Sequence, residues 1–256
     1  MGCFNSKSQF SDEEEALVQE TEALGFNKCS TAEVDLNIRK YSSEGKINRN
    51  QLKSLSSTLN LNLKNYETHI NIEKFMDKLK LSSELYDAQS LLIIGILLST
   101  GSDERKAQNL FQVMDRDETG SIDSSKSQVL LRQWIDCVLN LGLLVGDAQN
   151  HRSSQEKSAA YINKCRQAKE RWLYNMKNSL GAGFVTRDTF IRCTTSFKGG
   201  VLIEPRSFRS YLAKDAIENP EDIRKVSLKV PVAKFRKPAE ERTTSESTAP
   251  GGNQVC

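Results

Sequence analysis

The chain is poor in several residues and motifs that would carry chemistry. It has two histidines, His69 and His151, far apart in the sequence, and six cysteines without a Cys-x-x-Cys pair. No secretory signal precedes the cysteines, so we expect free thiols in a reducing compartment. The sequence also lacks a P-loop and a Gly-x-Gly-x-x-Gly motif. With no catalytic constellation in view, it predicts a binding protein and not an enzyme.

Long apolar runs and a strong net charge are missing as well. The longest apolar run, residues 91–98, is far shorter than the ~20 residues that span a bilayer. A net charge of +3 is too small to indicate nucleic acid as a partner. Only five prolines interrupt the chain, and no alternating segment is long enough for a sheet. The predicted fold class is therefore all-α.

The first seven residues carry a lipidation pattern. Gly2 and Ser6 fit the myristoylation motif Met-Gly-x-x-x-Ser/Thr. Cys3 beside Gly2 offers a thiol for palmitate, and two acyl chains anchor stably where one binds only marginally. We therefore expect a peripheral protein on the cytoplasmic face of a plasma, ciliary or endomembrane. Residues 1–15 would form this acylated, flexible segment, with an acidic spacer over 8–15; the alternative is an unmodified, solvated terminus.

Apolar residues recur at helical spacing along most of the remaining chain. Ser102 has the character of an N-cap, with acidic residues directly after it. We expect a loop over residues 146–157, where the sequence becomes polar. The predicted helical segments cover residues 11–39, 46–59 (after a turn), 70–80, 91–99, 103–114, 127–145 and 158–180.

One loop carries oxygen-bearing side chains at alternating positions around a glycine, Gly120. This pattern matches the first nine positions of an EF-hand calcium loop, in which alternate oxygens converge on one cation and the glycine permits a sharp turn. Ile122 is the apolar residue that joins such a loop to its partner through a short backbone ladder. The expected ligands are Asp115, Asp117, Thr119, Ser121 through its carbonyl, and Asp123.

The twelfth position of this loop departs from the pattern, because Lys126 stands where a bidentate glutamate is expected. Calcium takes six to eight oxygens, and the loop supplies about five. We therefore expect calcium, or magnesium, to bind weakly or not at all. In the alternative interpretation, the Lys126 ammonium lies among the aspartates and replaces the ion.

Around this loop, residues 91–123 resemble the passage from the second to the third EF-hand of the neuronal calcium sensor and calcineurin-B-like superfamily. The start Met-Gly-Cys-Phe resembles the doubly acylated plant calcineurin-B-like sensors. The resemblance implies further loops at intervals of roughly 36–40 residues, which places Tyr86 and Ile47 at positions equivalent to Ile122. A fourth candidate loop with Gly183 and Val185 lies 63 residues after Ile122, so an insertion near residues 146–160 is implied. None of these three loops keeps enough ligands, although the one before Ile47 offers Ser42, Glu44 and Asn48, so we interpret them as ion-free helix–turn–helix units.

The resemblance implies EF-hand-like helix–loop–helix pairs in two lobes. The N-terminal lobe would cover residues 16–101 and the C-terminal lobe residues 102–200, with its loops at 115–126 and near 178–189. A C-terminal helix over 201–225 and a disordered basic tail over 226–256 would follow. The tail is either solvated or a second lipid contact.

In this family an apolar groove receives a partner helix, so Trp134 and Trp172 are candidate contacts, although ordinary core packing is the alternative. The favoured function is a calcium-responsive membrane adaptor. An ion in the loop would shift the flanking helices and expose apolar surface to a protein target, by resemblance a kinase, phosphatase or channel segment. The second hypothesis is a calcium-independent scaffold with pseudo-EF-hands.

Overall fold

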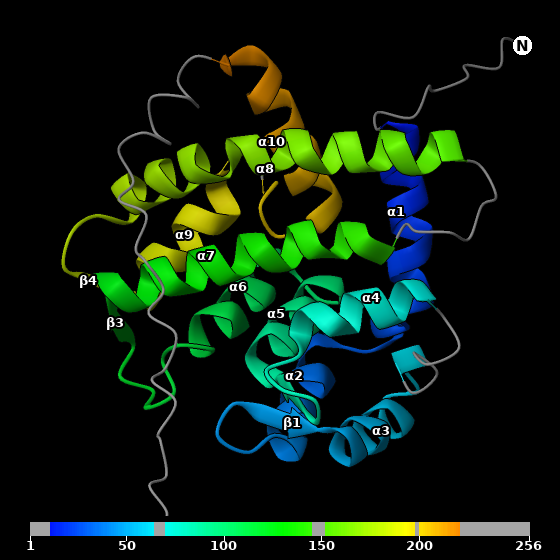
Figure 1. Ribbon diagram of the computed structural model, residues 1–256. Helices are drawn as coiled ribbons and strands as arrows, with labels where there is room; N and C mark the ends of the chain where they lie inside the picture. The colour runs from blue at the N-terminus through cyan, green and yellow to red at the C-terminus, as the bar shows by residue number, and fades with distance from the viewer. Residues whose placement is uncertain (1–10, 64–69, 145–151, 198–199, 221–256) are drawn as a thin grey trace, which may run out of the picture.

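The computed structural model describes residues 11–63, 70–144, 152–197 and 200–220. Within these ranges the chain is mostly helical, with two small sheets of two short strands each (Figure 1). The predicted all-α class is confirmed at this coarse level. His69 and His151 lie outside the described residues.

In the first half of the chain, α1, α2, α3 and α5 each begin after a residue whose polar side chain caps the helix. The segment predicted as helical over 11–39 divides in two, because Ser30 and Glu33 form a capping box that begins a new helix. Asp87 likewise caps the next buried helix by accepting from two backbone N–H groups. The elements are α1 (Asp12–Ala23), η1 (Phe26–Lys28), α2 (Thr31–Tyr41), β1 (Lys46–Asn48), α3 (Arg49–Thr58), α4 (Ile70–Leu79), β2 (Leu85–Asp87) and α5 (Ala88–Leu98).

The second half contains the longest helix. Ser102 caps α6 as predicted, accepting from the backbone N–H of Arg105. The expected loop over 146–157 is wrong from residue 152 onward, because its polar residues are good helix formers and extend the next helix backwards. The elements are α6 (Asp103–Gln112), β3 (Ser121–Asp123), α7 (Ser124–Asn140), η3 (Leu141–Leu144), α8 (Arg152–Leu180), β4 (Phe184–Thr186), α9 (Arg187–Ser196) and α10 (Pro205–Glu218).

The two sheets join loops that are distant in sequence. In the first, β1 pairs with β2 in antiparallel register, with Ile47 opposite Tyr86. In the second, β3 pairs with β4, with Ile122 opposite Val185. All four side chains are buried. Each ladder therefore ties two helix–loop–helix segments together through a buried pair of apolar residues.

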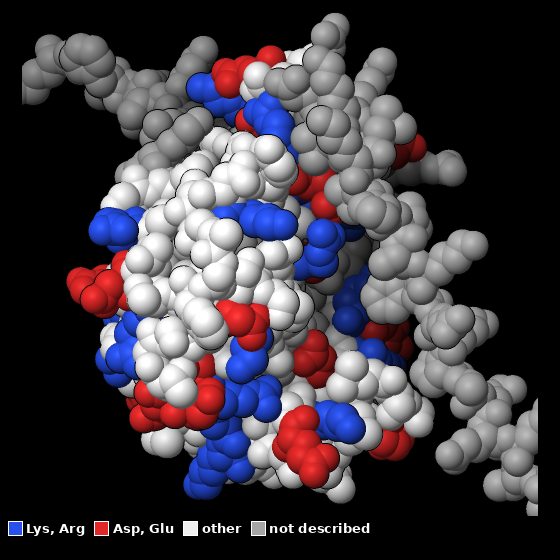
Figure 2. All heavy atoms as spheres, turned by 90° about the vertical axis from the view of Figure 1, so that its left-hand side faces the viewer, with Lys and Arg blue, Asp and Glu red and all other residues white. Residues whose placement is uncertain are grey.

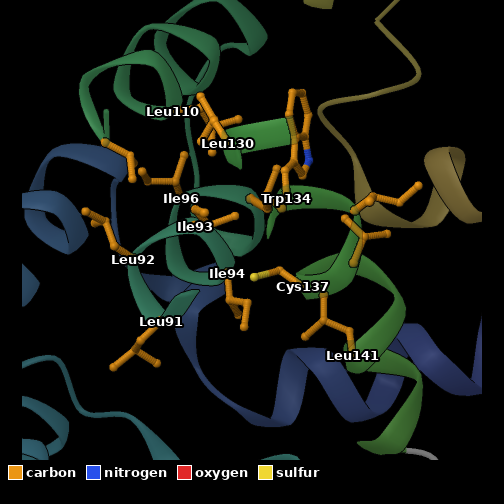
Figure 3. Close-up of a cluster of buried hydrophobic side chains, with 14 of the residues drawn as sticks. Leu91, Leu92, Ile93, Ile94, Ile96, Leu110, Leu130, Trp134, Cys137 and Leu141 are labelled. Carbon is orange, nitrogen blue, oxygen red and sulfur yellow. The ribbon is translucent and has the colours of Figure 1, made fainter. Parts of the chain in front are cut away.

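The apolar core runs through both halves of the chain. Helix α5 is buried on nearly all sides, and it packs against α2 on one side and against α7 on the other. Figure 3 shows Ile93 and Ile94 of α5 close to Trp134 and Cys137 of α7. Most of the buried apolar residues, from Leu24 to Ala216, belong to one cluster. This cluster includes residues on both sides of the boundary expected at 101/102.

Helix α1 begins where two predictions overlap, the flexible segment over 1–15 and the helical segment over 11–39. Its first residues were expected in a flexible spacer, but the helix begins at Asp12 because Ser11 caps it and four acidic residues favour a helix N-terminus. The helix contacts η3, α8 and α10 of the second half of the chain (Figure 1). Residues 1–10, including the lipidation motif, lie outside the described residues.

Helix α10 begins with Pro205 in its first turn and packs along α8. It is shorter than the helix predicted over 201–225. Its buried residues include Phe208, Arg209 and Leu212. The tail predicted over 226–256 lies outside the described residues.

Candidate metal loop and covered aromatic groove

The candidate loop connects the end of α6 to the start of α7. Gly120 has a φ of 76°, a left-handed conformation that glycine adopts without strain. The next residue begins β3, so the loop is held by its ladder with β4. This geometry brings the oxygens of the turn back toward the end of α6.

Asp115 accepts three hydrogen bonds from its own loop. The backbone N–H groups of Thr119 and Gly120 donate to its two carboxylate oxygens, each at 3.0 Å. The Thr119 hydroxyl lies 2.9 Å from Asp115 Oδ1 and 2.9 Å from the Ser121 carbonyl oxygen. With one proton, this hydroxyl donates to one of them at a time. Three of the predicted ligands, Asp115, Thr119 and the Ser121 carbonyl, therefore converge.

The remaining predicted ligands do not join this group. Asp123 caps α7. Its carboxylate accepts hydrogen bonds from Ser125 Oγ, which has the larger effect, and from the Lys126 backbone N–H, and both lower the pKa of this carboxyl below its usual range. Asp117 is exposed. In the described parts of the chain, no three His, Cys, Asp or Glu side chains are gathered closely enough to hold a metal ion.

A cation does approach Asp115, but it is not the predicted one. Arg187, the first residue of α9, places Nη2 3.7 Å from Asp115 Oδ2, and the Asp115 carboxylate is fully buried. The backbone N–H of Arg187 also donates to the Gly120 carbonyl at 3.0 Å. Among the described contacts, Lys126 meets the loop aspartates through its backbone and forms no ion pair with them. Arg187 was missed because it lies 72 positions after Asp115 in sequence, reached through the β3–β4 ladder.

These residues fit a divalent ion only in part. Asp115, Thr119 and Ser121 offer oxygens, but the twelfth position offers an ammonium, and a guanidinium lies beside the one buried carboxylate. Calcium prefers six to eight oxygens and a compensating negative charge. As it stands, the loop is closed by its own hydrogen bonds and does not fit a tight calcium site.

The two tryptophans predicted as partner contacts lie side by side in an aromatic groove. We use this name for the buried rings of Trp134 of α7, Trp172 of α8 and Phe190 of α9, of which the two tryptophans contact Phe208 of α10. The Trp134 and Trp172 rings pack edge to face, with their centroids 6.2 Å apart. The ring centroid of Phe208 of α10 lies 4.8 Å from that of Trp172 and 6.1 Å from that of Trp134. Both tryptophans are buried, because α10 covers the groove.

The indole N–H groups in this groove find no acceptor in the described part of the chain. Trp134 Nε1 and Trp172 Nε1 are both buried there without a hydrogen-bond partner. An unsatisfied buried donor costs about 1–3 kcal/mol. The covered groove is therefore well packed in its apolar contacts but incompletely satisfied in its polar ones.

Two arginine–carboxylate pairs hold α10 on the groove. Arg209 donates through Nε and Nη2 to both oxygens of Glu14 on α1, each at 2.7 Å. Tyr161 of α8 donates its hydroxyl to the same carboxylate, and burial raises the pKa of this phenol, which keeps it a donor. Asp215, near the end of α10, pairs with Arg171 of α8. Helix α10 is thus fixed by both of its neighbours.

The helices and one face of the surface can be compared with those of a membrane-spanning or strongly charged protein. No helix in the described ranges is long and apolar enough to cross a bilayer. Figure 2 shows the side of the molecule that carries β3 and β4, where basic and acidic side chains are interspersed in the lower half and uncharged residues cover much of the upper half. On this face neither sign of charge dominates.

The chain matches no family model, no curated protein and no solved structure.

Proposed function

We propose that this chain is a membrane-attached adaptor of the EF-hand type, which binds a helical segment of a target protein in the aromatic groove. The observation that carries this proposal is the seating of Phe208 of α10 against Trp134 and Trp172. A surface that accommodates an amphipathic helix of its own chain has the shape and polarity to accommodate another. A target helix would therefore replace α10. The proposal assigns no catalytic activity to the chain.

The EF-hand relationship is supported by the places where the loops pair. Ile47, Tyr86 and Ile122 follow one another at the family spacing, Val185 follows Ile122 after a longer interval, and the four residues pair two by two in short antiparallel ladders. In each case a helix precedes the ladder strand and another follows it. Paired loops of this kind are the architecture in which one ion can move two helices.

A calcium-responsive mode has a physical route through the core. Phe111 lies on α6, the helix that leads into the loop, and its ring centroid is 5.6 Å from that of Phe190. The Phe190 ring centroid is in turn 6.3 Å from that of Trp134. A shift of α6 on ion binding would thus reach the groove directly. For this to happen, calcium or magnesium must displace Arg187 from Asp115 and recruit waters in place of the missing glutamate.

The second candidate function is a calcium-independent scaffold with pseudo-EF-hands. The contact between Asp115 and Arg187 favours it, since it supplies a positive charge to the loop without an ion. Lys126 at the twelfth position acts in the same direction, because it repels a cation.

Calorimetry with calcium and with magnesium separates the two candidates. In the sensor, millimolar calcium releases or absorbs heat and changes the fluorescence of Trp134 and Trp172, and Asp115→Ala removes both signals. In the scaffold, neither signal appears in the parent chain. A fluorescence change that persists in Asp115→Ala would rule out the 115–126 loop as the sensor.

The groove itself is tested with a labelled peptide that spans residues 203–220, that is, α10 with its flanks. The peptide should bind the full chain more tightly when α10 is loosened by Phe208→Ala in the chain, because the groove is then easier to open. A peptide with Phe208→Ala is the matched control and should bind weakly. Equal binding of the two peptides would contradict a groove that recognises an aromatic anchor.

Membrane attachment is tested separately by fractionation of cells that express Gly2→Ala. We expect this variant in the soluble fraction, because a palmitate alone on Cys3 is a single signal. A Gly2→Ala protein that stays with the membranes would show that acylation at Gly2 is not what holds the chain there.

A further inference from the structure

A cavity of about 530 Å³ opens between the start of α1, the first half of α8 and the end of α10. This volume is within the range of pockets that hold small ligands. It lies on the outer side of α10 and is separate from the 115–126 loop. Its walls come from three helices, two of which are joined by the buried pair of Glu14 and Arg209. The cavity is therefore complete only while α10 is docked.

The cavity carries both signs of charge. Lys157 and Lys164 of α8 and Lys214 of α10 supply three ammonium groups, and Glu13 and Glu218 supply two carboxylates. Lys214 and Glu218 lie 3.7 Å apart but are 73% and 57% exposed, so their mutual attraction is weak and both remain available. The charged lining has one excess positive charge.

The rest of the lining is apolar. Ala160 and Ala213 form part of the wall, and Ile217 lines the cavity with 66% of its surface exposed. An exposed isoleucine beside three lysines is the combination found where proteins meet the interface of an anionic membrane, with the apolar group below the headgroups and the ammonium groups among them.

We infer that this cavity binds the headgroup of phosphatidylserine. That headgroup carries a phosphate and a carboxylate, which the lysines would bind, and an ammonium group, which Glu13 or Glu218 would bind. Its net charge of minus one complements the excess positive charge of the lining. A lipid such as phosphatidylglycerol, with the same net charge but no amine or carboxylate, leaves the two glutamates without a partner and opposed to its phosphate.

The membrane as the source of this headgroup rests on the proposed function. Ser11 lines the cavity, and the nine residue-to-residue steps from Gly2 to Ser11 reach at most about 30 Å when extended. Acyl chains on Gly2 and Cys3 would thus hold the cavity within that distance of the lipid surface. Phosphatidylserine is an abundant anionic lipid of the cytoplasmic leaflet.

The test uses the full chain made without acylation, so that the anchor does not dominate binding. Vesicles of phosphatidylcholine contain an equal minor fraction of either phosphatidylserine or phosphatidylglycerol, and binding is measured by sedimentation. We expect phosphatidylserine vesicles to bind about fivefold more tightly or better, the effect of roughly one additional charged contact. Equal binding of the two would overturn the inference, since attraction to charge alone does not distinguish them.

Two matched triple variants locate the site. Lys157→Gln, Lys164→Gln and Lys214→Gln together should abolish the preference for phosphatidylserine. Lys53→Gln, Lys78→Gln and Lys177→Gln, which remove the same charge from exposed helical positions elsewhere, should keep it. A preference that survives the first triple variant would place the site elsewhere and overturn the assignment.

Free O-phospho-L-serine distinguishes a lipid from a soluble ligand. It should compete with the vesicles only at about millimolar concentration, because it lacks the glycerol and acyl region that Ile217 would contact. Saturation of the cavity at micromolar phosphoserine would overturn the lipid assignment. Because the chain is unacylated here, these outcomes are independent of the fractionation of Gly2→Ala.

Discussion

Arg209 and Glu14, 195 residues apart, form a buried ion pair with two parallel hydrogen bonds of 2.7 Å. The Arg209 side chain is 1% exposed and that of Glu14 is inaccessible. The pair joins the first helix of the described chain to the last. Charges this deeply buried are tolerated only when paired, so the pair makes the docking of α1 and of α10 depend on each other.

Removal of one partner should therefore unfold or loosen both ends of the chain. We expect Glu14→Ala to lower the free energy of unfolding by about 3–5 kcal/mol, because the Arg209 guanidinium remains buried without a counter-charge. Urea denaturation followed by circular dichroism measures the change. The double variant Glu14→Met with Arg209→Met should recover most of the loss.

The neighbouring Glu15 provides the control for this prediction. Glu15 is 46% exposed and lies 3.7 Å from Arg206, so Glu15→Ala should cost less than about 1 kcal/mol. If Glu14→Ala and Glu15→Ala were equally mild, the buried pair would not be what holds α1 and α10 together.

In the loop, the two cations should oppose calcium. Arg187→Ala removes the guanidinium 3.7 Å from Asp115, and we expect it to raise calcium affinity roughly fivefold, the effect of one partly exposed charge contact. Lys126→Glu supplies the missing bidentate carboxylate and should raise it by about tenfold or more. Titration calorimetry measures both, with Arg192→Ala as a control from the same helix. A loop that gains no affinity from Lys126→Glu would not have calcium-loop geometry.

Close packing of α5 against α2 gives a third prediction. A Cβ at Gly95 would lie 2.6 Å from Val34 Cγ1 and 3.3 Å from Ile38 Cδ1. In most helices glycine to alanine stabilises by about 1 kcal/mol. Here Gly95→Ala should destabilise by about 1–3 kcal/mol, because the core is overpacked.

A double-variant cycle tests the cause. Val34→Ala alone should cost about 2 kcal/mol by leaving a cavity, but combined with Gly95→Ala it makes room for the new methyl group. The double variant should then be more stable than the sum predicts by about 1 kcal/mol. Strict additivity of the two free energies would mean that Val34 is not the group that limits space at Gly95.

Thiol reactivity should report the position of α10. Burial raises the pKa of Cys165 to about 12, and its Sγ donates to the Arg209 carbonyl at 3.4 Å. Burial also raises the pKa of Cys137, which lies between α7 and α5. At pH 8 both thiols are protonated and covered, so iodoacetamide should spare them and, among the four cysteines in the described ranges, modify the partly exposed Cys193 first.

Displacement of α10 should change one of these thiols and not the other. Excess peptide spanning residues 203–220 should speed alkylation of Cys165, read by mass spectrometry, because its cover is removed and its pKa falls toward the ordinary value. Cys137, whose thiol donates to the Ser90 carbonyl of α5, is the internal control. Equal acceleration of both cysteines would indicate general unfolding and not release of α10.

Local rules of sequence predicted a large part of this fold. Ser102 caps α6 because a short polar side chain before acidic residues favours a helix start wherever it occurs. The apolar stretch in α5 is buried because its exposure to water would cost free energy in proportion to its apolar surface. The ladder positions Ile47 and Ile122 followed from the turn glycines before them and the spacing between them.

Contacts between distant side chains were beyond such rules. The acidic residues after Ser11 were predicted to form a flexible spacer, because nothing local in the sequence shows that Glu14 forms an ion pair with Arg209. The approach of Arg187 to Asp115 depends on the register of β3 against β4. Trp134 and Trp172 were singled out as contacts, but their cover is Phe208, on a helix whose place only the three-dimensional packing defines.

Helix α10 follows α9 after a short connection, so on the proposed function any target competes with a tethered rival. A short tether gives such a rival an effective concentration on the order of millimolar. A target present at micromolar levels must then bind the bare groove roughly a thousandfold more tightly than α10 does. The fold would in this way impose an affinity threshold, admitting strong ligands and rejecting weak ones.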